Sequence, residues 1–95
     1  MYNKITSIDL KKLIPKVKII DIRDKHQFNL GNIPTATNIP MNSLLDNSDC
    51  YLNKEDIYYI CCQRGIRSEK TCRVLSAKGY KVVNIIGGYN SYKSN

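Results

Sequence analysis

Short apolar segments of strand character alternate with helix-forming segments along the whole of this 95-residue chain. Consecutive parallel strands cannot be joined by a tight turn and need a crossover, usually a helix, so this alternation is typical of a parallel sheet. The sequence therefore predicts an α/β fold, with a small, mainly parallel five-stranded sheet flanked by helices on both faces. The predicted strands are residues 4–6, 17–22, 36–39, 57–61 and 82–86.

Capping residues indicate where the two clearest helices begin and end. Asp24, with Gln27 three residues later, has the pattern of a capping box, and Gly31 supplies a helix stop. The longest predicted helix, residues 68–78, ends before Gly79 for the same reason. Helical spacing places four of its residues on the inner face, against the sheet. They are Ser68, Thr71, Cys72 and Leu75.

Three further segments complete the predicted secondary structure. Ser7 is expected to cap a helix that runs to about Leu13, because a nearby proline prevents the helix from continuing. Asn42 is expected to cap a brief helix, and the polar residues 46–56 are predicted to form a loop. A last short helix is expected after the tight turn at 87–88.

Length and composition limit the classes of protein that this chain can belong to. A chain of this length has room for one domain, residues 1–95, and its 42% hydrophobic and 24% charged content is ordinary for a globular protein. The apolar runs are too short to span a bilayer. The N-terminal residues become polar before a signal-peptide core could form, which predicts a cytoplasmic protein.

The formal net charge of +7 raises the question of nucleic-acid binding. The basic residues are spread along the chain, no basic run is longer than a pair, and no nucleic-acid motif surrounds them. We therefore expect a solvated basic surface that attracts small anions, with neither nucleic acid nor membrane as a partner.

The four cysteines are expected to be free thiols, because the chain has no secretion signal. They form no C-x-x-C pair, and the lone histidine, His26, is remote from them in sequence. This spacing argues against a zinc site, and neither a metal nor another cofactor is expected.

Cys62 stands where the strand 57–61 turns abruptly into a helix. A short loop that enters a helix directs several backbone N–H groups into one concavity, and the helix dipole behind them favours anions and the thiolate form of cysteine. Gly65 permits a backbone geometry that other residues resist, and Arg64 and Arg67 add positive charge. We predict that Cys62 is a nucleophile. The predicted anion-binding loop is Gln63, Arg64, Gly65, Ile66 and Arg67.

Asp21 and Arg23 follow the second predicted strand as Cys62 follows the fourth. The carboxyl ends of parallel strands meet at one edge of the sheet, where ligands collect. We therefore expect Asp21 and Arg23 to support the Cys62 loop, and the turn at 87–88 to join them.

Five motifs, in order along nearly the whole chain, resemble those of the single-domain rhodaneses, a sulfurtransferase family. They are Asp21-Ile22-Arg23, the segment Phe28–Pro34, Asn38-Ile39-Pro40, the loop Cys62–Ser68, and Gly87-Gly88 followed by Tyr92. The loop resembles the family's C-x-x-G-x-R-S active-site pattern. Gln27 stands where a glutamate is common in the family, so Asp24 or Glu69 is expected to be the acid partner of Arg23.

The resemblance implies a two-step sulfur transfer through a persulfide on Cys62. A small anionic donor such as thiosulfate supplies the sulfane sulfur, and sulfite leaves. The acceptor is cyanide in an assay and a thiol, free or on a protein, in the cell. In this scheme Arg64 and Arg67 hold the anion.

Three alternatives remain from the sequence. A cysteine-dependent phosphatase or arsenate reductase has the loop pattern C-x5-R, and Cys61 with Arg67 fits that frame, although Cys62 with Arg67 gives the tighter ring. A non-catalytic binding module would keep the fold and serve as a docking surface. A redox relay would use Cys61 or Cys72 to resolve an oxidised Cys62.

Overall fold

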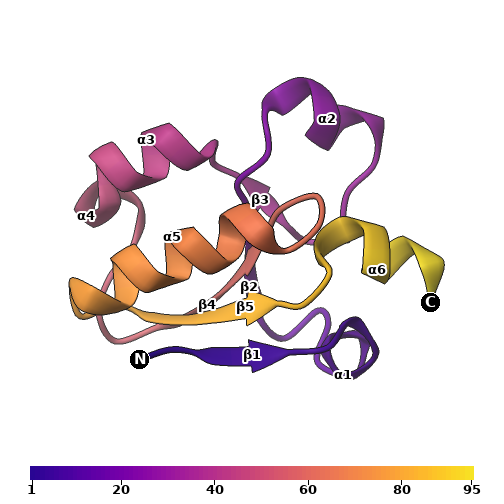
Figure 1. Cartoon of the computed structure of the whole chain (residues 1–95), viewed down its shortest axis with the longest axis horizontal. Coiled ribbons are helices and arrows are strands. Elements are labelled where there is room, and N and C mark those ends of the chain that lie inside the picture. Colours follow the sequence, from indigo (N-terminus) through magenta and orange to yellow (C-terminus); the bar gives the residue numbers. More distant parts are fainter.

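The computed structural model describes all 95 residues and contains one five-stranded sheet in the order β1-β5-β4-β2-β3 (Figure 1). Every pair of neighbouring strands is parallel. The predicted α/β class is therefore confirmed, with a sheet that is wholly parallel. The strands are β1 (Asn3–Ile5), β2 (Lys18–Asp21), β3 (Thr37–Asn38), β4 (Ile57–Cys61) and β5 (Lys81–Ile85).

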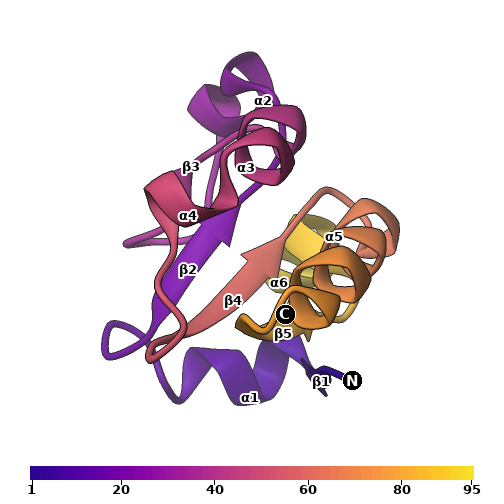
Figure 2. The ribbon, with the colours of Figure 1, turned by 90° about the vertical axis from the view of Figure 1, so that its left-hand side faces the viewer.

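Helices cover both faces of the sheet, as predicted. The helices α3 (Met41–Asp46), α4 (Ser48–Tyr51) and α5 (Ile66–Ala77) lie on one face, and α1 (Ser7–Lys11) lies on the other (Figure 2). The helix α6 (Gly88–Ser94) contacts α1, while α2 (Lys25–Leu30) lies beyond the carboxyl ends of the strands (Figure 1). No helix combines the length and the apolar composition that a membrane span requires.

The strand β4 separates two hydrophobic clusters. Tyr58 and Ile60 belong to the cluster on the α5 side, whereas Cys61 belongs to the cluster with Leu10 of α1. Successive side chains of a strand point to opposite faces, so the apolar run 57–61 fills both clusters at once. The same alternation returns Cys62 to the α5 side.

The caps and the inner face of the two clearest helices are confirmed. The Asp24 carboxylate accepts a hydrogen bond from the Gln27 backbone N–H at 2.8 Å, and Gly31 ends α2. The inner face of α5 is buried at every predicted position, namely Ser68, Thr71, Cys72 and Leu75.

Two predicted caps are wrong. The side chain of Thr6, rather than that of Ser7, accepts from the Asp9 N–H at 3.2 Å, and α1 ends at Lys11 rather than near Leu13. The helix α3 begins after Pro40, whose fixed φ already suits a helix start, so Asn42 is not a cap.

Two helix boundaries also differ from the prediction. Residues 46–56 are not all loop, because they contain α4, whose Ser48 hydroxyl donates to the Leu44 carbonyl at 2.9 Å. The helix α5 begins at Ile66 instead of Ser68. The loop after Cys62 is therefore shorter than predicted.

Candidate active site

Cys62 directly follows β4, at the edge where the carboxyl ends of the strands meet. Cys62 is only 2% exposed, yet it borders a cavity of about 390 Å³. A small anion can therefore reach the sulfur although bulk water covers little of it. The cavity is lined by Ile22, Arg23, Gln27, Cys62, Gln63, Arg64, Ile66 and Arg67.

The Cys62 sulfur lies among hydrogen-bond donors from the backbone. The N–H of Gly65 lies 3.0 Å from Sγ and the N–H of Ser68 lies 3.3 Å from it. Donors fixed in this way stabilise negative charge on sulfur. Gly65 belongs to the predicted loop, whereas Ser68 lies one residue beyond it.

Gly65 has a left-handed backbone, with φ 90°, at the turn into α5. A Cβ atom there would lie only 2.8 Å from the backbone nitrogen of Gly87. Only glycine combines this φ with so close an approach of two backbone segments. The residue therefore aims its N–H at Cys62 and lets the turn before α6 pack against the loop.

The start of α6 is hydrogen-bonded to the Cys62 loop. The Tyr89 N–H donates to the Cys62 carbonyl at 2.8 Å, and the Asn90 N–H donates to the Gln63 carbonyl at 3.0 Å. The turn at 87–88 thus joins the site, as the sequence predicted.

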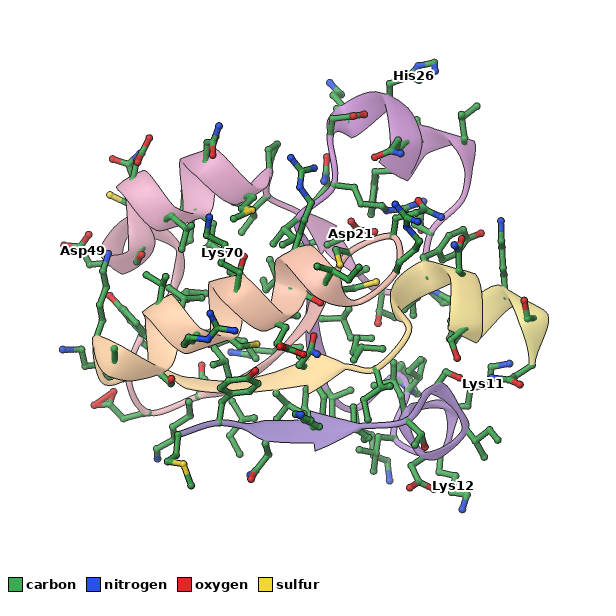
Figure 3. All side chains as sticks on the ribbon, viewed as in Figure 1. Lys11, Lys12, Asp21, His26, Asp49 and Lys70 are labelled. Atoms are coloured by element: carbon green, nitrogen blue, oxygen red, sulfur yellow. The ribbon has the colours of Figure 1, made fainter.

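Asp21 and Arg23 form a buried ion pair below the loop. Arg23 is 3% exposed and Asp21 is fully buried, and their closest charged atoms, Nη2 and Oδ2, are 2.8 Å apart. Burial by itself lowers the pKa of Arg23, but the hydrogen bonds and charge of Asp21 outweigh it and raise this pKa above its ordinary value. Figure 3 shows Asp21 in the interior, whereas His26 and Lys12 lie at the periphery.

The prediction that Asp24 or Glu69 pairs with Arg23 is wrong. Asp24 caps α2, and Glu69 lies 3.6 Å from Arg73 on the exposed side of α5. Arg23 lies in a bend just beyond the end of β2, and both its backbone N–H and its guanidinium donate to the Asp21 carboxylate.

Arg23 links this ion pair to the loop. Its Nη1 donates to the Gln63 side-chain oxygen at 2.9 Å, and the Gln63 amide donates to Asn90 at 2.5 Å. The guanidinium also lies 4.5 Å from the centre of the Tyr89 ring. Asp21 therefore supports the loop through Arg23 without lining the cavity.

Arg64 and Arg67 are exposed and line the cavity mouth. Neither lies within ion-pairing distance of a carboxylate. Their charges are available to an anion that enters the cavity.

Two buried polar residues next to Cys62 were not among the predicted site residues. The Ser68 hydroxyl lies 3.2 Å from Cys62 Sγ and donates to the Asn84 side-chain oxygen at 2.5 Å. The sequence signal for Asn84 is a single polar residue within the otherwise apolar predicted strand 82–86.

Cys61 and Cys72 are buried away from the cavity. Burial, and then the charge of Asp21, raise the pKa of Cys61 far above its ordinary value. Burial also raises the pKa of Cys72 to about 12. Because Cys61 faces the α1 side and Cys62 the α5 side, the Cys61 frame of a phosphatase loop does not match the cavity.

These environments predict a clear difference in thiol reactivity. At neutral pH, iodoacetamide will alkylate Cys62 and the exposed Cys50 of the folded protein, while Cys61 and Cys72 stay unmodified. Only the thiolate reacts, and burial both shields these two thiols and keeps them protonated. Peptide mapping by mass spectrometry measures the pattern, with urea-unfolded protein, in which all four react, as the control. Alkylation of folded Cys61 at the rate of Cys50 would contradict it.

Comparison with known proteins places these features in a family. The sequence model of the rhodanese-like domain matches residues 6–95. A protein of Allochromatium vinosum named Sulfurtransferase is 33% identical over 92 residues, which cover 93% of this chain and 85% of that protein. Adenylyltransferase and sulfurtransferase uba4 of Ogataea parapolymorpha is 31% identical over 75 residues, which cover 78% of this chain but only 19% of that longer protein.

A solved structure agrees with the sequence match. The crystal structure of a rhodanese-like domain protein from Staphylococcus aureus has a TM-score of 0.87 and 38% sequence identity to this chain. The match covers 95% of this chain and 90% of that chain.

Proposed function

The chain belongs to the rhodanese-like domain family, and from that premise we propose that it is a sulfurtransferase that carries sulfane sulfur on Cys62. One observation carries the proposal. The Cys62 sulfur accepts two backbone hydrogen bonds and borders a cavity that Arg23, Arg64 and Arg67 also line. The Allochromatium relative named Sulfurtransferase supports the same reaction class.

In the first step, the Cys62 thiolate attacks the outer sulfur of a donor such as thiosulfate. A bond forms between Cys62 Sγ and that sulfur, while the bond from the outer sulfur to the sulfonate sulfur breaks. Sulfite leaves with the electron pair, and a persulfide anion remains on Cys62. This covalent intermediate divides one difficult transfer into two easier displacements.

In the second step, an acceptor nucleophile attacks the outer sulfur of the persulfide. Cyanide forms thiocyanate, and a thiolate forms a new persulfide. The sulfur–sulfur bond to Cys62 breaks with its electron pair on Sγ, which regenerates the thiolate. No external oxidant or reductant is needed, because each step is a displacement at sulfur in which the nucleophile supplies one electron pair and the leaving group takes one away.

The positive side chains at the cavity mouth fit an anionic donor. Arg64 and Arg67 have no carboxylate partner, so they can bind the sulfonate group and then the departing sulfite. The formal net charge of +7 also attracts anions from a distance. In the cell we propose a thiol acceptor, free or on a protein.

A sulfur-loading experiment tests the proposal. Reduced protein treated with thiosulfate is expected to gain one sulfur atom on Cys62, and cyanide is expected to remove it as thiocyanate. Intact-mass and peptide mass spectrometry locate the sulfur. The Cys62→Ser variant will neither load nor turn over, whereas Cys50→Ser, at an exposed position on α4, will behave as the natural protein. Sulfur loading on another cysteine, or thiocyanate release by Cys62→Ser at the rate of the natural protein, would refute the assignment.

A further inference from the structure

We propose that Asn84 is a positioning residue that turns the Ser68 hydroxyl proton away from Cys62 and so favours the protonated, resting form of the thiol. The inference rests on the proposed role of Cys62 as the sulfur carrier. It concerns how readily that thiol becomes the reactive thiolate.

The orientation of the Asn84 side chain is set by the loop. Its Nδ2 faces the Gly65 carbonyl oxygen at 3.5 Å, and a carbonyl oxygen can only accept a hydrogen bond. The amide nitrogen must therefore lie on the Gly65 side. The amide oxygen, Oδ1, is left facing Ser68, and Asn84 is only 3% exposed, so water does not compete for it.

This orientation determines where the single hydroxyl proton of Ser68 lies. Asn84 Oδ1 carries no hydrogen, so the 2.5 Å contact requires Ser68 to be the donor. Ser68 Oγ then presents its lone pairs to Cys62 Sγ at 3.2 Å. It can accept the hydrogen of the thiol, but it cannot donate to a thiolate while its proton is held by Asn84.

Opposing hydrogen bonds thus meet at the Cys62 sulfur. The N–H groups of Gly65 and Ser68 favour the thiolate, whereas the lone pairs of the Ser68 hydroxyl favour the thiol. When Cys62 ionises, Ser68 must either leave its lone pairs against the negative sulfur or turn its proton to it. The second choice leaves the buried Asn84 oxygen without a donor, which is costly.

The other titratable or charged groups around Cys62 stay in place when Asn84 is replaced. Cys61 on β4 precedes it, Cys72 lies on α5 in the same hydrophobic cluster, and Tyr89 of α6 bonds its carbonyl. Three cationic groups line the same cavity, namely Arg23, Arg64 and Arg67. A change confined to Asn84 therefore alters two contacts, those with the Ser68 hydroxyl and with the Gly65 carbonyl, and leaves these titratable and charged groups in place.

The test is the pH dependence of Cys62 alkylation by iodoacetamide, followed on Cys62 by tandem mass spectrometry. In Asn84→Val the Ser68 hydroxyl is free to donate to the thiolate, so the midpoint of the profile should fall by about one pH unit. The readout needs no sulfur transfer, so it remains informative even if the proposed function fails. Asn84→Ala should give the same shift, and it replaces Asn84→Val if that variant does not fold.

A double-mutant cycle separates the effect of the Ser68 proton orientation from the effect of a looser Cys62 loop. In a Ser68→Ala background, Asn84→Val should leave the midpoint where Ser68→Ala alone puts it, because no hydroxyl remains to be turned. Ser48→Ala, which removes a buried hydroxyl from α4, should leave the natural profile unchanged. An unchanged midpoint in Asn84→Val, a rise in it, or an equal shift with and without the Ser68 hydroxyl would overturn the proposal.

Discussion

Replacing Asp21 with asparagine is expected to lower the free energy of unfolding by about 3–5 kcal/mol, because it leaves a buried guanidinium without its counter-charge. Arg23 is 3% exposed and receives its only carboxylate contacts from Asp21, through Nε and Nη2. Asparagine has nearly the same shape but no charge, and one of its two terminal groups is a donor. Equilibrium urea unfolding, monitored by circular dichroism, measures the difference.

Two variants show that the loss comes from the buried charge. Asp9→Asn disrupts the exposed ion pair with Lys12 and should cost at most about 1 kcal/mol. The double variant Asp21→Leu with Arg23→Met removes both charges and should recover part of the stability that Asp21→Asn loses. If Asp21→Asn unfolds at the same urea concentration as the natural protein, the charge of Asp21 does not hold Arg23 in solution.

The strands were the most predictable part of the fold. The bounds of β4 match the apolar run 57–61 residue for residue, because that run is β-branched and aromatic and ends at a loop. The helix α4 was missed because residues 48–51 are polar and carry no helical apolar spacing. The bond from the Ser48 hydroxyl to the Leu44 carbonyl ties the start of α4 to the end of α3, and a periodicity argument cannot detect such a contact.

The site was predictable where its residues follow one another in the chain. The Cys62 loop is local, and its cysteine, glycine and arginines mark it directly in the sequence. Asn84 is 16 residues from Ser68, and their contact arises only when α5 packs on β5. The partner of Arg23 was predicted wrongly because Arg23 lies beyond the end of β2. The alternation of side chains along a strand therefore does not fix the direction of the Arg23 side chain.

The glycines of the site allow positive φ and a close approach of α6 to the Cys62 loop, and Gly88 is the glycine whose replacement should affect function most. It has φ 60°, and a Cβ atom there would lie 2.8 Å from the carbonyl carbon and oxygen of Gln63, and closer still to the carbonyl oxygen of Cys62. Gly88→Ala must therefore push α6 away from the loop. The hydrogen bond from the Tyr89 N–H to the Cys62 carbonyl would break with it.

Sulfur transfer by Gly88→Ala should fall about 100-fold, the effect expected when a reacting atom is displaced by about 1 Å. Gly79→Ala is the matched control, because Gly79 has φ 94° but meets only the flexible Lys54 side chain, at 3.6 Å. Both variants carry the cost of a left-handed alanine, roughly 1–2 kcal/mol, and only Gly88→Ala adds about 1–3 kcal/mol of overpacking. Thiocyanate release and urea unfolding of the two variants measure these differences. Equal activity in Gly88→Ala and Gly79→Ala would mean that the contact of α6 with the loop does not position Cys62.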